Sequence, residues 1–221
     1  MTMNDTREET TLSQKVVRGL TEDIISGRVP SGDKLEIQVI ADRFGISATP
    51  VRDALRELAI AGLVEIVPRR GATVLSVDVA RLRDMFETAA EIEGLCARFA
   101  AERMTRSERL RLEMVAKQAH EAAEAGDAVL YAQINDKFHE LLFDGARNVS
   151  LAELARSFRV RLSPFRAKLF YQKRRVVTSD NEHERIVEAI VAGKPEDAQN
   201  AAREHLNNAS LNVIEYFEAN A

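Results

Sequence analysis

The chain has 221 residues, of which 45% are hydrophobic and 30% charged, so it holds enough apolar material for one large or two small folded domains and is not an intrinsically disordered chain. Its formal net charge is −4 at pH 7, which excludes a protein that binds nucleic acid through bulk positive charge. Any affinity for DNA must come from individually placed arginines.

The cysteine content and the first residues bear on the cellular compartment. Cys96 is the only cysteine, so no intrachain disulfide can form, and its place in an apolar helical pattern favours a buried thiol in a reducing compartment. The first ten residues are polar and acidic, and no run approaches the roughly 18 apolar residues of a membrane span. We therefore expect a cytoplasmic protein with no membrane partner.

The first two helices are predicted between residues 12 and 44. Apolar side chains recur at every fourth position of the first helix, up to Ser26 and the stop at Gly27: Leu12, Val16, Leu20 and Ile24. Three residues give a short second helix an apolar face: Val39, Ile40 and Phe44. Gly45 can take the left-handed conformation that ends this helix.

The third helix begins near Pro50, whose missing N–H costs nothing in a first turn, and Ser47 or Thr49 can cap it. Its apolar face recurs at steps of four and three: Val51, Leu55, Leu58 and Gly62. Its outward face carries Thr49, Arg52, Asp53 and Arg56. Two helices joined this tightly form a helix-turn-helix, whose second helix presents its N-terminal half to the major groove. An ordinary amphipathic hairpin with two solvated arginines would show the same periodicity.

The residues after the third helix favour the DNA-binding interpretation. Residues 63–67 and 72–75 are predicted strands, and the turn 68–71 between them carries two arginines at its tip. This pattern predicts a small two-stranded β wing. The candidate DNA-binding residues lie on the second predicted helix, at the start and on the outward face of the third, and on the turn of the wing. They are Gln38, Ser47, Ala48, Thr49, Arg52, Arg56, Arg69, Arg70 and Gly71.

Three motifs of this region carry a family resemblance: GRVPSGDKL at residues 27–35, the pattern from Ser47 through Thr49-Pro50-Val51-Arg52 to Gly62-Leu63-Val64, and Pro68-x-x-Gly71. Together they closely resemble the winged-helix domain of GntR-family transcriptional regulators. Members of that family commonly carry Arg directly after the Ser, where this chain has Ala48. The resemblance therefore implies that one usual base or phosphate contact is missing and that the operator differs from the family norm.

From residue 78 to the end, the pattern is helical throughout, after a short junction at residues 76–78. The predicted helices span residues 78–104, 106–125, 127–144, 149–171, 180–192 and 195–219, with a polar stretch at residues 172–179. These helices predict an antiparallel bundle. The expected fold is mainly α, with a winged helix-turn-helix domain over residues 1–76 and an all-α bundle over residues 77–221, which the family resemblance implies is the effector-binding and dimerisation domain.

Three of the four histidines lie on three different bundle helices, each on or beside an apolar face: His139, His183 and His205. Asn135 lies four residues before His139 and shares its face. Imidazoles directed into a bundle need polar partners. From the residues alone, they are either core histidines with hydrogen bonds or the ligands of a metal.

The segments 135–139, 182–190 and 201–206 resemble the FCD ligand-binding domain of FadR-type GntR regulators, and the resemblance covers roughly residues 78–215. It implies that a divalent metal is held by Asn135, His139, His183 and His205, and that a small carboxylate effector binds there. The usual Asp ligand is Asn135, whose uncharged carbonyl disfavours hard cations, so we expect zinc or nickel. Asp136 cannot substitute, because one residue turns a helix by about 100°.

A second departure concerns the partner of an effector carboxylate. The family often has an Arg four residues before Glu93, where this chain has Ala89. Arg161 and Arg166, on a later helix, are candidate substitutes, although arginines on a helix are more often solvated.

Three functions remain open from the sequence. The first is a regulator, a repressor released by a small organic acid, that binds a palindromic double-stranded operator as a homodimer, since one winged helix buries only about 600–1,000 Å² on DNA. The second is a metal-responsive regulator without an organic effector. The third is a metal-dependent bundle enzyme, against which the wing, the recognition helix and the lack of a His-Glu-x-x-His motif argue. We therefore predict that the chain is not an enzyme.

Overall fold

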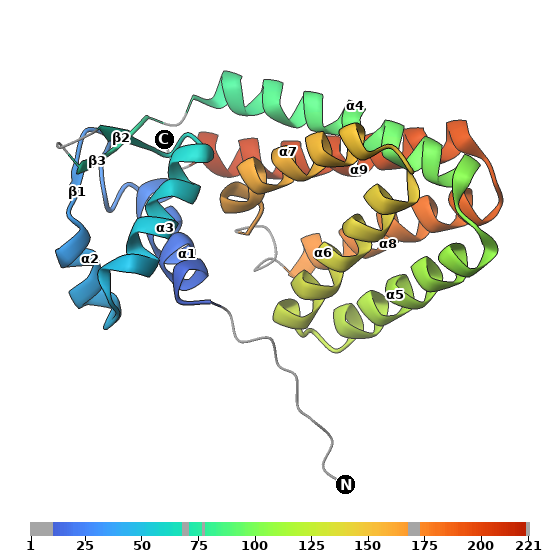
Figure 1. The fold of residues 1–221 in the computed structure, drawn as a ribbon, viewed down its shortest axis with the longest axis horizontal. Helices are drawn as coiled ribbons and strands as arrows, with labels where there is room; N and C mark the ends of the chain where they lie inside the picture. The colour runs from blue at the N-terminus through green and yellow to red at the C-terminus, as the bar shows by residue number, and fades with distance from the viewer. Residues whose placement is uncertain (1–10, 68–70, 77, 168–172, 220–221) are drawn as a thin grey trace, which may run out of the picture. The chain divides into compact units, whose positions relative to one another are not determined.

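The computed structural model describes residues 11–67, 71–76, 78–167 and 173–219. The chain divides into two compact units, Met1–Val77 and Asp78–Ala221. The first unit combines three helices with a small sheet, and the described part of the second is entirely helical (Figure 1). The predicted fold class, mainly α with an N-terminal winged helix-turn-helix and an all-α remainder, is confirmed.

The first unit contains α1 (Leu12–Ile25), α2 (Ile37–Phe44) and α3 (Ala48–Ile60). Thr11 begins α1 with a capping box in which its side chain and that of Gln14 bond each other's backbone N–H. Gly45, with φ 65°, ends α2 in the left-handed conformation, as predicted. The apolar face of α3 is buried and packs on α1. The predicted face of α2 is wrong in one residue, because Val39 is 61% exposed and Ala41 is buried in its place.

The sheet has three antiparallel strands in the order β1-β3-β2. They are β1 (Lys34–Leu35), β2 (Val64–Val67) and β3 (Gly71–Val74). The prediction of two strands missed β1, which pairs Lys34 with Thr73 and Leu35 with Ala72. Two residues are too short to show an alternating pattern, so only the pairing with β3 identifies this strand.

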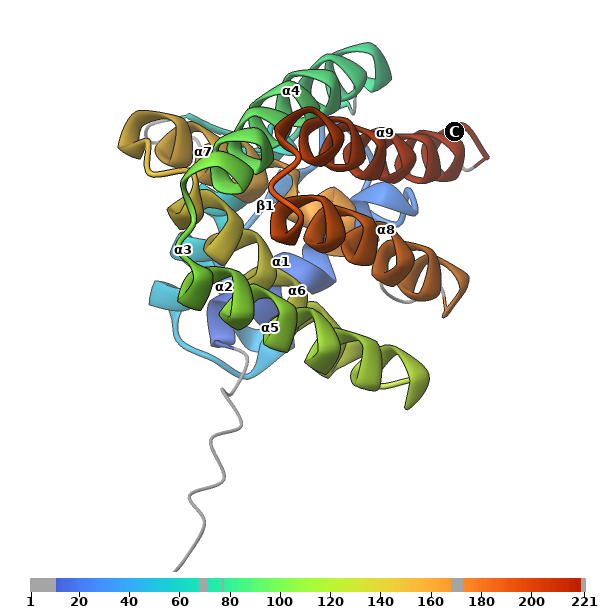
Figure 2. The same ribbon diagram turned by 90° about the vertical axis from the view of Figure 1, so that its right-hand side faces the viewer.

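Six helices make up the described part of the second unit: α4 (Val79–Arg103), α5 (Arg106–Glu124), α6 (Ala128–Gly145), α7 (Val149–Ala167), α8 (Lys173–Val191) and α9 (Pro195–Ala219). Helices α4 and α9 run side by side, and α8 lies between α9 and α5 (Figure 2). A Cβ on Gly94 would lie 2.7 Å from Cγ of Arg203, so the glycine permits the close approach of α4 to α9.

Helix α8 begins at Lys173, seven residues before the predicted start at 180. The sequence predicted a polar stretch between helices at residues 172–179, because polar residues occupy the positions that face inward in this part of α8. Arg175 and Ser179, four residues apart, are both buried there, with 4% and 2% of their surface exposed. The inward face of α8 therefore starts with polar side chains, which a hydrophobic pattern does not detect.

The core of the second unit is formed mainly by aliphatic and aromatic side chains of α4, α5, α6, α8 and α9. Cys96 is fully buried in it, and burial raises the pKa of its thiol to about 12, as expected for an inert structural cysteine. Among the helices that the structure describes, none is long and apolar enough to cross a bilayer.

Candidate metal centre and DNA-reading helix

Three histidines from three helices meet inside the second unit. His139 comes from α6, His183 from α8 and His205 from α9, and their exposed fractions are 1%, 1% and 4%. The ring centroids are 4.6–5.4 Å apart. One nitrogen of each ring lies within 4.8 Å of the others. The structure thus brings together three side chains that lie up to 66 positions apart in the chain.

Two buried carboxylates form hydrogen bonds with two of these rings. Oε2 of Glu93 lies 2.8 Å from Nδ1 of His139, and Oε2 of Glu182 lies 2.7 Å from Nδ1 of His205. Each carboxylate can accept a hydrogen bond from Nδ1–H of its neutral ring, which leaves Nε2 as the free ligand atom. Metal-binding histidines commonly donate their second nitrogen to a carboxylate in this way.

Glu93 and Glu182 were not predicted to belong to the site. Glu182 also accepts hydrogen bonds from Nη1 of Arg175, at 2.9 Å, and Nδ2 of Asn208, at 2.8 Å. The only sequence signal for Glu93 is a carboxylate on the apolar face of α4, where Phe86, Ala90 and Ala97 are also buried. Such a residue needs a buried partner, but the sequence does not say which one.

Several polar atoms of the cluster are buried without a hydrogen-bond partner among the described residues. They are Nε2 of His139, both ring nitrogens of His183, and Oδ1 and Nδ2 of Asn135. Each unsatisfied buried group costs on the order of 1–3 kcal/mol. A cation bound among these atoms would satisfy Nε2 of His139, one ring nitrogen of His183 and the amide oxygen of Asn135 together, so the residues present fit a metal.

The protonation state of the cluster also suits a metal. Burial, together with the nearby positive charge of Arg159, holds the pKa of His139 well below its usual range. Burial likewise lowers the pKa of His183 and of His205. The three rings are therefore neutral at physiological pH, and the neutral imidazole is the form that ligates a metal.

A small recess opens beside the histidines. It is lined by Asn135, Arg166, Arg175, Ser179, His205, Leu206 and Ala209. Its cavity volume is about 10 Å³, room for about one water molecule. Asn135, buried to 1% exposure, therefore faces the histidines and the recess at once.

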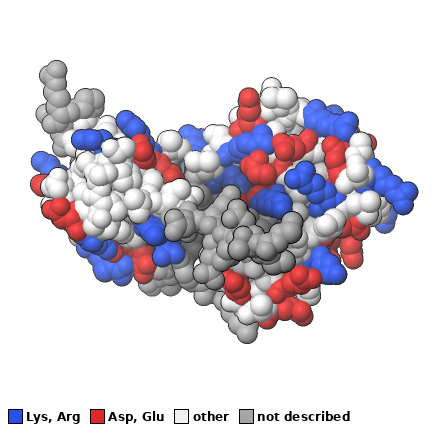
Figure 3. Space-filling model, turned by 60° about the horizontal axis from the view of Figure 1, so that its bottom comes forward, with Lys and Arg blue, Asp and Glu red and all other residues white. Residues whose placement is uncertain are grey.

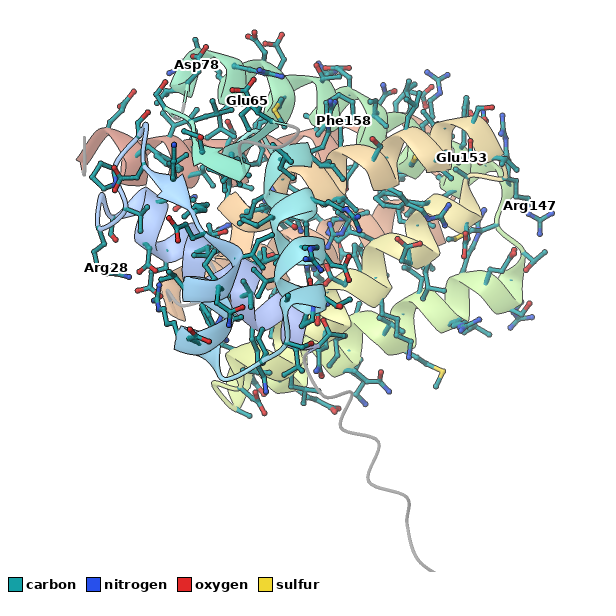
Figure 4. All side chains as sticks on the ribbon, turned by 60° about the vertical axis from the view of Figure 1, so that its left-hand side comes forward. Arg28, Glu65, Asp78, Arg147, Glu153 and Phe158 are labelled. Carbon is teal, nitrogen blue, oxygen red and sulfur yellow. The ribbon has the colours of Figure 1, made fainter. Side chains whose placement is uncertain are left out.

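The two arginines predicted to bind an effector lie in different surroundings. Arg166 is 8% exposed and lines the recess. Arg161 does not line this recess; its guanidinium lies over the ring of Phe158, 5.7 Å from the ring centroid. Phe158 is labelled on α7 in Figure 4. The separation arises because five residues along a helix turn the side chain by about 500°, or 140° from the starting face.

Asp136 lies where helical geometry places it, away from the histidines. Its side chain is 72% exposed and its Oδ1 accepts a hydrogen bond of 2.6 Å from Nη2 of Arg159. It cannot stand in for the carboxylate that Asn135 lacks. Ala89, at the position where the family often has an arginine, is 1% exposed.

In the first unit, α3 exposes the polar side chains that the sequence assigns to DNA. Thr49, Arg52 and Arg56 are exposed, and Nη1 of Arg56 donates to Asp53 at 2.9 Å. Ser47 precedes the helix as its N-cap residue but makes no side-chain cap bond, and Ala48 is the first helical residue. Ser47 therefore leaves its hydroxyl available for another partner.

The structure describes two further predicted DNA-binding residues, Gln38 and Gly71. Gln38 is exposed on α2 and donates to Oδ1 of Asp42 at 2.8 Å. Gly71 begins β3 with φ 89°, a backbone conformation that favours glycine. Arg69 and Arg70 lie outside the described residues.

Asp23, on α1, connects this helix to α2 through a buried carboxylate. It is 3% exposed and accepts hydrogen bonds from Nε of Arg28, at 2.8 Å, and from Nη1 of Arg43 on α2; Arg28 is labelled in Figure 4. Burial alone would raise the pKa of Asp23, but the hydrogen bonds from the two arginines hold it below its usual value. The charged carboxylate thus fixes α2 relative to α1.

Acidic and basic side chains are interspersed on the face shown in Figure 3. This distribution agrees with the net charge of −4. The face in this view carries no broad positive surface, so any DNA affinity there would depend on a few placed side chains.

Both parts of the chain match known protein families. Residues 12–74 match the bacterial regulatory proteins of the gntR family, and residues 84–208 match the FCD domain. The chain is 30% identical over 205 residues to the “Probable D-xylose utilization operon transcriptional repressor” of Paenarthrobacter nicotinovorans, covering 89% of this chain and 86% of that protein. It is 28% identical over 218 residues to the HTH-type transcriptional regulator LutR of Bacillus subtilis, covering 89% of this chain and 99% of LutR.

The fold is shared with a solved structure of E. coli McbR/YncC, with a TM-score of 0.67 and 21% identity over 93% of this chain and 98% of that one. A helix-turn-helix of this kind implies DNA binding, and an FCD domain implies a small-molecule effector. The FCD match alone spans more than half of the 221 residues. The chain therefore belongs to the GntR family of bacterial transcriptional regulators, carries the FCD domain of that family, and is not an enzyme.

Proposed function

We propose that this regulator is a cytoplasmic repressor whose FCD domain binds a divalent metal and is released from its operator by a small organic acid. The observation that carries the proposal is the convergence of three buried histidines, two of which, His139 and His183, have buried ring nitrogens without a protein partner among the described residues. The first unit, up to residue 76, would bind DNA, and the remainder would bind the effector and dimerise.

The metal would be held by Nε2 of His139, Nε2 of His205 and one ring nitrogen of His183, with the carbonyl of Asn135 beside them. An imidazole-rich set without a carboxylate favours zinc or nickel over magnesium or calcium. When bound, the metal supplies a Lewis-acidic centre that a carboxylate oxygen can ligate. Glu93 and Glu182 would orient two of the rings by accepting hydrogen bonds from their Nδ1–H groups.

DNA would be read by the N-terminal half of α3, where Thr49, Arg52 and Arg56 are exposed. Two copies on a palindromic operator would place two such helices in successive major grooves. Arg69, Arg70 and Gly71 of the wing would contact the adjacent backbone.

The effector step requires a change of shape, because the recess in this conformation has room for about one water molecule. An organic acid must displace side chains to enter, so it binds an opened form better than the form described here. That difference in affinity allows it to shift the population competent for DNA.

The experiment combines metal content with operator binding. Protein purified without a His-tag should contain near-stoichiometric zinc or nickel, and a panel of organic acids should raise its melting temperature only while the metal is present. The acid that does so should weaken the shift of an operator fragment in a gel. Metal-free protein that responds normally to the same acid would defeat the metal part of the proposal.

A second candidate is a regulator that senses the metal itself, and the small volume of the recess favours it. In that case, a chelator alone should change operator binding and restored metal should reverse the change. Organic acids would then have no effect at any metal content.

A further inference from the structure

Three buried arginines surround the histidines and leave the site with an excess of positive charge. Arg159 and Arg166, from α7, are each 8% exposed, and Arg175, from α8, is 4% exposed. Arg166 and Arg175 line one recess together with His205, and Arg159 lies on the same helix as Arg166. Burying a guanidinium is costly unless an anion or hydrogen-bond acceptor accompanies it.

The buried carboxylates do not balance these arginines. Glu182 pairs with Arg175 at 2.9 Å, and Glu93, 2% exposed, faces His139. The other buried carboxylate of this unit, Asp180, bonds His120 on α5. Three arginines face two glutamates, so positive charge is in excess, and a divalent metal would add two more positive charges. Asp136 offsets part of it from the solvent-exposed side of Arg159.

Arg166 is the buried arginine of this group that lacks an anionic partner among the described residues. Within the part of the chain that the structure describes, its guanidinium makes no hydrogen bond or ion pair, and its charged neighbours are Arg159, Glu93, Asp136 and Arg175. Burial, followed by repulsion from Arg159, lowers its pKa to about 10. A guanidinium held in this way would gain from an anion placed beside it.

The recess beside Arg166 offers mainly hydrogen-bond donors. Arg175, Asn135 and Ser179 line it together with Arg166, and their exposed fractions are 4%, 1% and 2%. Nδ2 of Asn135 has no partner among the described residues, and Ser179 shares a hydrogen bond with Tyr131. His205 lines the same recess, so an anion there lies next to the proposed metal.

We propose that the effector carries two acidic groups, one for the metal and a second, carboxylate or phosphate, that enters the recess formed by Arg166, Arg175 and Asn135. This inference rests on the proposed metal and organic-acid site, and it narrows the effector to a small dianion. The first acid group ligates the metal, and the second neutralises Arg166. A monoanion can satisfy only one of the two positions.

The test compares two acids of four carbons each, butyrate and succinate, by calorimetric titration of zinc-loaded protein. Succinate should bind at least about tenfold more tightly, because a charge-assisted hydrogen bond is worth roughly 1.5–3 kcal/mol, or about 10- to 150-fold. Arg166→Gln should remove this advantage and leave butyrate unchanged. 3-Phosphonopropionate identifies the second group as phosphate-like if it binds more tightly than succinate, and as carboxylate-like if it binds less tightly.

Two controls separate a recess residue from a merely structural one. Arg156→Gln makes the same charge change on α7, but its guanidinium bonds Glu140 and Asp144 at the surface, so both acids should bind as before. Without ligand, Arg166→Gln should melt at the same or a higher temperature than the unmodified protein, because it removes a buried charge that has no partner.

Equal affinity for butyrate and succinate would overturn the inference and leave the organic-acid site standing. If Arg166→Gln bound neither butyrate nor succinate, the inference would also be overturned, since Arg166 would then contact the first carboxylate. If neither acid bound to zinc-loaded protein, the organic-acid part of the proposed function would fail together with the inference.

Discussion

His183 differs from the other two histidines of the cluster in its hydrogen bonds. Both of its ring nitrogens lack a partner among the described residues, whereas His139 and His205 each face a glutamate. Its ring stacks on Phe138, with 4.3 Å between the centroids, which fixes its plane without a hydrogen bond. His183 is therefore the ligand whose polar atoms depend most on a bound metal.

Replacing His183 by alanine should abolish stoichiometric metal. A chelator should lower the melting temperature of the unmodified protein, since metal stabilises the folded state by mass action, and it should have no effect on His183→Ala. Elemental analysis and a thermal scan measure both. His120→Ala, outside the cluster, should keep its metal and its chelator response; if His183→Ala kept them too, the histidines would be core residues only.

Arg52 tests the assignment of α3 to DNA. It is exposed at the start of the helix, and Arg52→Ala should cost about 1–3 kcal/mol of operator affinity without changing the fold, because it removes a base or phosphate contact. Gel shifts with the operator measure the loss. Arg106→Ala, an exposed arginine at the start of α5, is the matched control and should bind as before. Unchanged affinity in Arg52→Ala would remove α3 from the reading role.

At the scale of the elements, Arg109 joins the C-terminal ends of two helices that do not follow one another in the chain. From α5, its Nη2 donates to the carbonyl of Ala101 at 2.6 Å and its Nε to that of Met104 at 3.2 Å, at the end of α4. Its Nη1 donates to the carbonyls of Ile190 and Val191 at the end of α8. One cation therefore satisfies carbonyls that the helices themselves leave unpaired.

Arg109→Ala should destabilise the protein by about 2–3 kcal/mol, the value of one or two hydrogen bonds to a charged group. Arg109→Lys should recover only part of the loss, because an ammonium group cannot span both helix ends as the planar guanidinium does. Urea unfolding followed by circular dichroism measures the difference. Arg111→Ala, exposed on the same helix, should change stability little, and an equal loss there would contradict the assignment.

His120 and Asp180 form a pH-dependent contact between α5 and α8. Nδ1 of His120 lies 2.7 Å from Oδ2 of Asp180, and Nε2 lies 3.6 Å from Oε1 of Glu124. The hydrogen bond to Asp180, and then its charge, raise the pKa of His120, with smaller contributions from Glu124 and Glu184. The protonated imidazole is therefore favoured in the folded state.

A raised pKa in the folded state sets the sign of the pH effect. The contact stabilises fully below the unfolded pKa of about 6.5, and its contribution is lost as pH rises through the higher folded pKa. The difference in melting temperature between the unmodified protein and His120→Gln should therefore be larger at pH 5.5 than at pH 9. The same difference at both pH values would show that protonation of His120 does not matter.

At the scale of the whole molecule, the regulator should act as a dimer. A single winged helix buries only about 600–1,000 Å² on DNA, too little for selective binding, so two copies should occupy half-sites about one helical turn apart. Light scattering at micromolar concentration should give twice 24.7 kDa, both alone and with operator DNA. A monomer under both conditions would count heavily against this arrangement.

The sequence by itself determined the elements whose signals are local. The helix-turn-helix followed from four-residue spacings and from Gly45, which ends α2 as expected, because periodicity and capping involve neighbours along the chain. The same periodicity predicted that the side chains of His139, His183 and His205 point into the bundle, and all three are buried. The family resemblance then indicated a regulator, which the domain matches confirm.

Only the tertiary structure decided which distant polar groups meet. Strand β1 exists because Lys34 and Leu35 pair with β3, and the first turns of α8 are helical although their buried face includes the polar residues Arg175 and Ser179. Glu93 reaches His139 across 46 positions, and Arg166, but not Arg161, lines the recess. The free energy of burying a charge depends on the partners that surround it in space, and those partners come from helices that no local pattern connects.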